Sequence, residues 1–139
     1  MTNAEKLLLD TNAALFVLRG RRLLPAAQSA IDTASGDGRL FLSAVSAWEI
    51  GLLMARGRLK SPLSAVDFFL EAVNRFGCKV CEVTAPIFAN SSFLPHFDHR
   101  DPADCLLIAT ARALDLTIVT SDRKILGYGI AGHVKSMAC

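Results

Sequence analysis

Short apolar runs alternate along the chain with helical stripes of apolar residues. Unbroken apolar runs are typical of strands buried on both faces of a parallel sheet, and together with one mixed segment they predict strands at residues 6–9, 39–43, 79–83 and 116–120. Helices are predicted between and after these strands, at residues 13–18, 25–34, 46–57, 65–76, 84–94, 101–113 and 123–126. Repeated strand–helix units predict a three-layer α/β/α sandwich with a mostly parallel central sheet and right-handed crossovers.

Acidic residues fall where the predicted strands end or where the following helices begin. Five of the thirteen acids share this placement: Asp10, Glu49, Asp101, Asp104 and Asp122. The carboxyl ends of parallel strands lie at one edge of a sheet, which is where α/β proteins place their sites. We therefore expect these carboxylates to converge.

Helix capping offers a purely structural explanation for several of these acids when each is taken singly. Ser46 and Glu49 have the spacing of a capping box that opens a helix. Asp101 stands directly before a proline, a strong helix start, and Asp104 takes the third position of that helix. Capping explains Asp10 less well, because this residue follows three leucines and its next two neighbours could cap the helix equally well.

Taken together, clustered carboxylates require compensation. Four of them at spacings of about 5 Å, with an effective dielectric constant of about 20, repel one another by roughly 20 kcal/mol as an upper bound. That repulsion rivals the net stability of a domain, about 5–15 kcal/mol. Such a cluster must take up protons or bind a cation, and hard oxygen ligands select Mg²⁺ or Mn²⁺. A divalent metal site follows if the carboxylates meet.

Length and composition limit the alternatives. With 139 residues, of which 52% are hydrophobic, the chain should form one domain over residues 1–139 with a sizeable core. The longest apolar runs, such as residues 13–18, are far shorter than the roughly 20 residues of a membrane helix. The first residues also lack the apolar core of a signal peptide. We expect a cytoplasmic protein that does not bind a membrane.

Basic residues accompany the acids, although the formal net charge of +2 does not by itself indicate a nucleic-acid binder. Those flanking the predicted edge include Arg19, Arg21, Arg22, Arg100, Arg123 and Lys124. Solvated surface charge is the ordinary explanation of each one. A cationic rim around an acidic metal pocket nevertheless suits a phosphodiester substrate, since metals hold the reacting phosphate and arginines hold its neighbours.

The remaining chemistry-bearing residues give weaker indications. Cys78 and Cys81 border a predicted strand in which residues three apart point to opposite faces, so we expect buried, reduced thiols rather than a zinc site. The histidines are too scattered to be a ligand set: His96, His99 and His133.

Several polar residues next to the acids could orient ligands or water from a second layer, although turns and helix caps use the same residue types. They are Thr11, Asn12, Thr120 and Ser121. Trp48, next to Glu49, is expected to pack against other side chains of the protein rather than to stack on a base.

Four segments, in order along essentially the whole chain, resemble the PIN domain and specifically the VapC-like ribonuclease toxins. They are Leu-Leu-Leu-Asp-Thr-Asn (7–12), Ser-Ala-Val-Ser-Ala-Trp-Glu-Ile (43–50), His-Arg-Asp-Pro-Ala-Asp-Cys-Leu-Leu-Ile-Ala (99–109) and Ile-Val-Thr-Ser-Asp (118–122). The resemblance implies a PIN-like fold and endonucleolytic cleavage of RNA that depends on Mg²⁺ or Mn²⁺. By motif, it places the catalytic, metal-binding acids at Asp10, Glu49, Asp104 and Asp122, with Asp101 as an accessory residue.

The resemblance also implies partners and a mechanism. VapC-like proteins are toxins of type II toxin–antitoxin pairs, so we expect a cognate small antitoxin, an RNA substrate and a homodimer. A metal-activated water would attack the phosphate in line, without a covalent enzyme intermediate, and leave a 5′-phosphate and a 3′-hydroxyl.

Two positions depart from the VapC-like pattern. Asn12 stands where histidine is frequent, and Cys105 stands where arginine is usual. Loss of the arginine contact would lower activity or change the target. An alternative function therefore stays open, that of a catalytically degenerate PIN-like domain acting as a partner-binding or autoregulatory module.

Two unrelated enzyme classes fit less well. A haloacid-dehalogenase-type phosphatase needs a general acid two residues after its first aspartate, where this chain has Asn12. A receiver-like phosphoacceptor domain needs an adjacent acid pair near its first strand and a lysine that ends a late strand, and the chain has neither.

Overall fold

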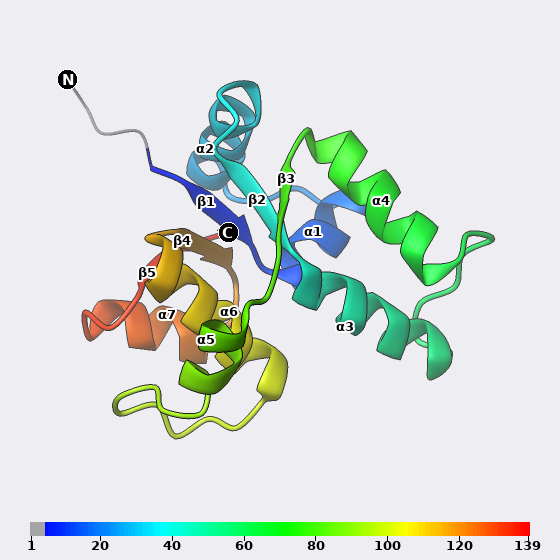
Figure 1. Cartoon of the computed structure of the whole chain (residues 1–139). Helices are drawn as coiled ribbons and strands as arrows, with labels where there is room; N and C mark the ends of the chain where they lie inside the picture. The colour runs from blue at the N-terminus through cyan, green and yellow to red at the C-terminus, as the bar shows by residue number, and fades with distance from the viewer. Residues whose placement is uncertain (1–4) are drawn as a thin grey trace.

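The computed structural model describes residues 5–139, which form five strands and seven helices (Figure 1). The strands are β1 (Leu7–Leu9), β2 (Leu40–Ser43), β3 (Lys79–Cys81), β4 (Thr117–Thr120) and β5 (Lys135–Ala138). The helices are α1 (Thr11–Leu18), α2 (Pro25–Gly36), α3 (Ala44–Ala55), α4 (Ala65–Phe76), α5 (Ala85–Asn90), α6 (Pro102–Leu114) and α7 (Arg123–Ile130). Within these residues, no helix has both the length and the apolar character needed to cross a membrane.

The strands form one sheet in the order β3-β2-β1-β4-β5. Leu8 of the central β1 is in register with Phe41 of β2 on one side and with Ile118 of β4 on the other. Every pairing in the sheet is parallel. All strands therefore end at the same edge, and the segments that leave β1 and β4 begin there with Asp10 and Ser121.

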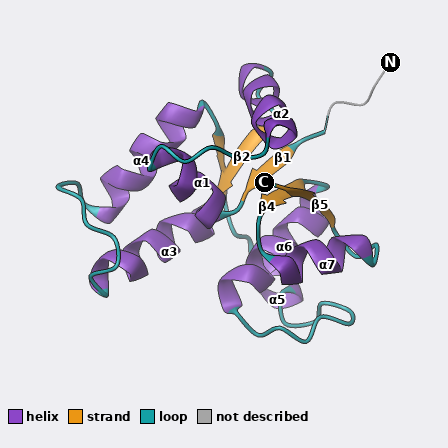
Figure 2. Ribbon diagram, turned by 180° about the vertical axis from the view of Figure 1, so that it is seen from behind, coloured by secondary structure: helices purple, strands orange, loops and turns teal. Residues whose placement is uncertain are grey.

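Helices cover both faces of this sheet (Figure 2). Leu7 and Leu9 pack on one face against α1, α2 and α4, whereas Leu8 packs on the other face against α6 and α7. None of the three leucines exposes more than 2% of its surface. The predicted α/β/α sandwich is confirmed, and burial on both faces explains why β1 is apolar without alternation.

The predicted start of α3 was wrong. Its N-cap is Ser43, whose hydroxyl accepts a hydrogen bond from the Val45 N–H at 3.0 Å. Ser46 therefore lies inside the helix and does not cap it. The capping-box interpretation of Ser46 and Glu49 is incorrect, because Glu49 lies beyond the first turn.

Three other features differ from the sequence prediction. α5 ends at Asn90 rather than near residue 94, and α7 continues past residue 126 to Ile130. β5 was not predicted. It is an edge strand whose residues are exposed or half-buried, so no buried apolar run marks it in the sequence.

The four cysteines are free thiols, as expected. Cys81 is buried in β3, and the half-buried Cys78 donates a hydrogen bond from its thiol to the Val73 carbonyl. Burial raises the pKa of each of these two thiols to about 11. Within residues 5–139, no cysteine belongs to a cluster that could hold a metal ion.

Candidate active site

Asp10 follows β1 directly and is buried, with 4% of its surface exposed. Its Oδ2 accepts a hydrogen bond of 2.7 Å from the Thr120 hydroxyl at the end of β4. The same hydroxyl oxygen accepts a 2.9 Å hydrogen bond from the backbone N–H of Asp122. Thr120 thus links the first carboxylate of the edge to the segment that carries the last one.

Glu49 is held from α1 rather than by its own helix. The Thr11 hydroxyl donates to Glu49 Oε1 at 2.6 Å. Thr11 Oγ1 also lies 2.7 Å from Ser46 Oγ. Because a hydroxyl has only one proton and Thr11 gives its proton to the carboxylate, Ser46 is the donor of the second bond. Ser46 and Thr11 therefore form a chain of hydroxyls that orients Glu49.

Asp101 and Asp104 belong to the start of α6. Asp101 is the N-cap, and its Oδ1 accepts from the backbone N–H groups of Ala103 (3.0 Å) and Asp104 (3.2 Å). Asp101 is exposed, and this capping role accounts for its presence. The Asp104 side chain is only 15% exposed, and its Oδ2 lies 3.0 Å from His99 Nε2.

Asp122 is the N-cap of α7. Its Oδ1 accepts from the backbone N–H groups of Lys124 at 2.8 Å and Ile125 at 3.1 Å. Capping therefore explains part of the role of Asp122. The cap uses only one of the two carboxylate oxygens, however. The negative charge of Asp122 still acts on Asp10 and Asp104.

The carboxylates influence one another electrostatically. The pKa of Glu49 is raised to about 7, chiefly by burial and also by the charges of Asp10, Asp104 and Asp101, against the opposing effect of the Thr11 hydrogen bond. Burial raises the pKa of Asp104 to about 6, aided by Asp101, Asp122 and Asp10. The pKa of Asp10 is also raised, first by burial and then by Asp122. Asp10, Glu49, Asp104 and Asp122 thus lie close enough for their charges to act on one another, and Asp101 lies beside Asp104.

Histidine is the one basic residue type that contacts these carboxylates within the described part of the chain, through His99 and Asp104. Within residues 5–139, neither a lysine nor an arginine forms an ion pair with any of the four carboxylates. Partly buried carboxylate oxygens without a protein cation are the donor set that Mg²⁺ and Mn²⁺ prefer. The residues present therefore fit a divalent ion, which would relieve the repulsion that, with burial, raises the pKa values of Asp10, Glu49 and Asp104.

The basic residues predicted to contact substrate fall into two groups, one beside the cluster and one at the far end of α1. Arg100 lines the groove beside the site, and Arg123 is exposed at the start of α7, next to Asp122. Arg19, Arg21 and Arg22 are exposed beyond the far end of α1. Arg19 lines a separate hollow, and the Arg21 guanidinium lies 5.1 Å from the centre of the Phe16 ring.

The four polar neighbours of the acids separate into two kinds. Thr11 and Thr120 are buried and bond to the carboxylates, as described above. Asn12 and Ser121 are exposed, and neither side chain makes a hydrogen bond within the described part of the chain.

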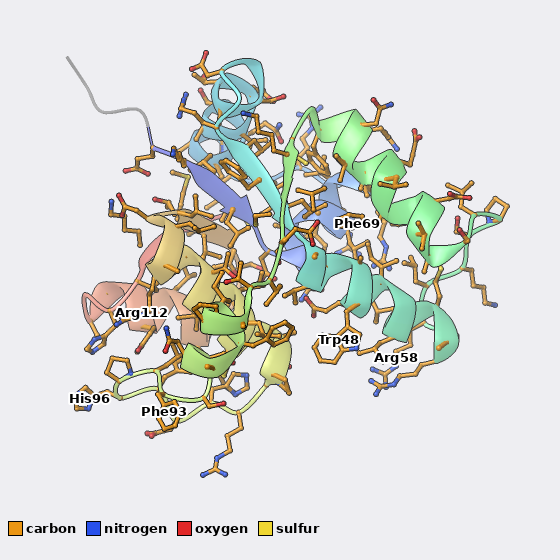
Figure 3. The ribbon with its side chains drawn as sticks, in the orientation of Figure 1. Trp48, Arg58, Phe69, Phe93, His96 and Arg112 are labelled. Carbon is orange, nitrogen blue, oxygen red and sulfur yellow. The ribbon has the colours of Figure 1, made fainter. Side chains whose placement is uncertain are left out.

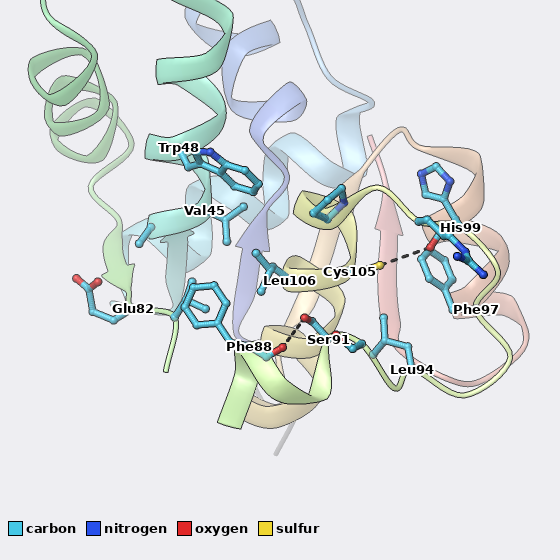
Figure 4. A pocket seen from close by; sticks show the side chains of 15 residues that line it. Val45, Trp48, Glu82, Phe88, Ser91, Leu94, Phe97, His99, Cys105 and Leu106 are labelled. Carbon is cyan, nitrogen blue, oxygen red and sulfur yellow. Dashed lines mark hydrogen bonds between the residues drawn. The ribbon is translucent and has the colours of Figure 1, made fainter. Parts of the chain in front are cut away.

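A groove of about 1130 Å³ opens next to the cluster (Figure 4). Its walls include Trp48 of α3, Phe88 of α5, and His99 and Cys105 near the start of α6. Trp48 is 47% exposed, and Figure 3 shows its ring projecting from α3. The Cys105 thiol donates a weak hydrogen bond to the His99 carbonyl at 3.5 Å.

The three histidines lie in two separate places. His99 reaches Asp104, as described above. His96 and His133 have ring centres 5.6 Å apart, and His133 stacks on Tyr128 with centres 4.8 Å apart. They contact each other because the loop after α5 carries His96, at the rim of the molecule in Figure 3, back to the end of α7. The only sequence signal for His99 is its place just before the Asp101 cap.

Comparison with known proteins places this site in a family. The family model described as the PIN domain matches residues 7–129. No curated protein sequence matches the chain. Among solved structures, the chain is similar to a DNA-bound VapBC from Salmonella typhimurium, with 17% identity over 96% of this chain and 98% of the other and a TM-score of 0.68.

Two further solved structures share the fold. One is VapBC2 from Rickettsia felis bound to a fragment of its promoter DNA, with 14% identity over 95% of this chain and 97% of the other and a TM-score of 0.65. The second is a toxin–antitoxin complex from Klebsiella pneumoniae, with 15% identity over 86% and 90% of the two chains and a TM-score of 0.55. The family match covers most of the chain and includes the four clustered acids, so the chain belongs to the PIN domain family.

Proposed function

We propose that this PIN domain is an endoribonuclease that depends on Mg²⁺ or Mn²⁺. The observation that carries the proposal is the cluster of Asp10, Glu49, Asp104 and Asp122. The pKa values of the first three carboxyl groups are raised by burial and by mutual repulsion. A hydrolytic nuclease needs such a site, because the phosphodiester and the attacking water must both be activated at neutral pH.

Asp10, Glu49, Asp104 and Asp122 would hold one or two ions, directly or through water. Bound Mg²⁺ or Mn²⁺ supplies a Lewis acid that lowers the pKa of water and neutralises charge on the phosphoryl oxygens. The protein contributes orientation: the Thr11 hydroxyl holds Glu49, and the Thr120 hydroxyl holds Asp10. Exposed Arg100 and Arg123 are the basic candidates for contact with neighbouring phosphates.

We further infer that the chain is the toxin of a VapBC-type toxin–antitoxin pair. The support is its similarity in fold to VapBC structures and to the Klebsiella pneumoniae toxin–antitoxin complex. Its partner would be a small cognate antitoxin, and the working form a cytoplasmic homodimer. Affinity purification of the chain with the product of the neighbouring open reading frame tests this pairing, and two products that do not copurify would contradict it.

The enzymatic proposal is tested by RNA cleavage with Mg²⁺, with Mn²⁺ and with EDTA. Wild-type protein should cleave only with metal and leave 5′-phosphate and 3′-hydroxyl ends. Asp10→Asn, which keeps the shape of the side chain and a hydrogen-bond acceptor for Thr120, should be inactive yet folded. Cleavage that persists in EDTA, or products that carry a 2′,3′-cyclic phosphate, would overturn the mechanism.

The degenerate-module alternative rests on Cys105. Its thiol faces the His99 carbonyl and the groove, and within residues 5–139 it makes no hydrogen bond to a site carboxylate. Cys105→Ser should therefore keep both fold and cleavage, because serine can donate the same hydrogen bond. A folded wild-type chain that binds its partner but cleaves no RNA with either metal would favour the non-enzymatic module.

A further inference from the structure

We propose that His99 is a positioning residue for Asp104, held in one neutral tautomer by Lys124. The proposal rests on the proposed function, because it concerns how one carboxylate of that site is oriented. Three side chains form an unbroken sequence of contacts. Lys124 Nζ lies 2.8 Å from His99 Nδ1, and His99 Nε2 lies 3.0 Å from Asp104 Oδ2.

The hydrogen-bond chemistry of lysine determines the tautomer. A charged lysine has three N–H donors and no acceptor, so Lys124 must be the donor to His99 Nδ1. That nitrogen must then be unprotonated. The single ring proton of a neutral imidazole therefore sits on Nε2, and Nε2 donates it to Asp104 Oδ2.

This tautomer argues against His99 as a metal ligand. His99, Asp101 and Asp104 offer ligand atoms that all lie within 4.8 Å of one another. An imidazole nitrogen that carries a proton has no free lone pair for a metal, however, and the other nitrogen is occupied by Lys124. The geometry instead matches the outer partner of a metal-ligating carboxylate, which fixes the direction of one oxygen.

The contacts also tie three parts of the chain together. His99 lies in the segment before α6, Asp104 lies in the first turn of α6, and Lys124 lies in the first turn of α7, two residues after Asp122. The His99 side chain is only 24% exposed, and its ring meets the Phe97 ring edge-on with centres 5.8 Å apart. Packing therefore restrains the ring while its two nitrogens connect α6 to α7.

His99 completes a pattern in which carboxylates of the cluster receive a neutral donor from another element. Asp10 has the Thr120 hydroxyl, and Glu49 has the Thr11 hydroxyl. Asp104 has the His99 imidazole. A neutral donor orients a carboxylate without cancelling its charge, so the cluster keeps its attraction for a cation.

The first test reads the tautomer directly. In metal-free protein labelled with ¹⁵N at histidine, we expect the His99 ring to carry its proton on Nε2 at pH 8. Lys124→Met should weaken this preference, because only the Asp104 carboxylate would then favour it. A wild-type His99 ring protonated on Nδ1 would overturn the proposal, and this result does not depend on any RNA cleavage.

The second test measures Mn²⁺ affinity and cleavage. His99→Ala should weaken Mn²⁺ binding and lower kcat/KM by about 10- to 100-fold, the usual cost of losing such a partner. His99→Gln, whose amide N–H can donate to Asp104, should recover part of both losses, and Lys124→Met should cause a smaller loss of both. The control is His96→Asn, a histidine change away from the acids. His96 has a positive φ, which asparagine tolerates, so this variant should change neither Mn²⁺ affinity nor kcat/KM.

Two results would contradict the proposal: unchanged Mn²⁺ affinity in folded His99→Ala, or no recovery by His99→Gln. A wild-type chain that binds Mn²⁺ with the expected His99 dependence but cleaves no RNA would instead contradict only the proposed function.

Discussion

At the residue scale, a structural role and a metal-binding role of Glu49 lead to opposite predictions. Its carboxylate accepts a hydrogen bond from Thr11 of α1, and Ser43, not Ser46, caps its own helix. Glu49 therefore contributes nothing to the start of α3. It adds a partly buried negative charge to a site that already has others.

We expect Glu49→Gln to keep the fold and to lose function. Without metal, its melting temperature should equal or exceed that of the wild type, because removing the charge relieves repulsion. Its stabilisation by Mn²⁺ should shrink, and RNA cleavage should fall by at least about 100-fold. Thermal melts with and without Mn²⁺ and an RNA cleavage assay measure these effects. Glu71→Gln, a change of an exposed glutamate on α4, is the control. An active variant with an undiminished Mn²⁺ shift would assign Glu49 a structural role.

The raised pKa of Glu49 also predicts how stability depends on pH in EDTA. In the unfolded chain this carboxyl ionises near its ordinary pKa of 4.5, whereas in the folded protein its pKa is about 7. Between these values the folded state binds more protons, so the free energy of unfolding should fall as pH rises and should level off above pH 7. Glu49 contributes at most about 3 kcal/mol to this fall, and less because water still reaches the carboxyl.

Urea unfolding in EDTA at pH 5 and pH 7.5 measures this dependence. The wild type should lose more stability between the two values than Glu49→Gln does. Equal losses in the two proteins would show that Glu49 titrates normally in the folded state.

At the element scale, each helix that starts beside the site has an N-cap of its own, and one of these caps, Asp122, also belongs to the site. Asp101 and Asp122 cap α6 and α7 through backbone N–H groups. Ser43 caps α3 in the same way. The sequence pattern at Ser46 is a chance match to a capping box, because its hydroxyl faces Thr11 instead.

Substitution of the two serines should separate these roles. Ser43→Ala should reduce the free energy of unfolding by about 1 kcal/mol, the usual cost of losing an N-cap, and should leave Mn²⁺ affinity unchanged. Ser46→Ala should weaken Mn²⁺ binding, because Thr11 loses the donor that helps to orient it toward Glu49. Urea unfolding and Mn²⁺ titration of both variants test the distinction. If Ser46→Ala lowered the free energy of unfolding and left Mn²⁺ affinity unchanged, the capping-box interpretation would be restored.

At the scale of the whole molecule, the domain folds around a site whose negative charges repel one another. Metal binding should therefore stabilise the folded state as well as permit chemistry. At a Mn²⁺ concentration about 100 times its Kd, the gain is about 2.7 kcal/mol, or roughly 10 °C in Tm for a chain of this size. Differential scanning calorimetry in EDTA and in Mn²⁺ measures the shift. Asp10→Asn should show little of it, and a wild-type Tm that does not respond to Mn²⁺ would contradict a metal site.

The sequence alone was sufficient for the architecture and for the position of the acids along it. Leu7, Leu8 and Leu9 form an unbroken apolar run because both faces of β1 are buried. The pattern of strands and helices also indicated a parallel sheet, whose strands must all end at one edge. Asp10 and Asp122 could be assigned to that edge because backbone geometry, which is local, determines where a strand ends.

Only the tertiary structure decided which side chains touch. The bond from Thr120 to Asp10 joins residues 110 positions apart, and the Thr11–Ser46 contact joins residues 35 apart. The contact of His99 with Lys124 depends on the path of the loop before α6, for which no periodic pattern exists in the sequence. The start of α3 was mispredicted for the same reason. Capping and burial depend on which distant segments pack against a helix, and local propensity cannot specify that packing.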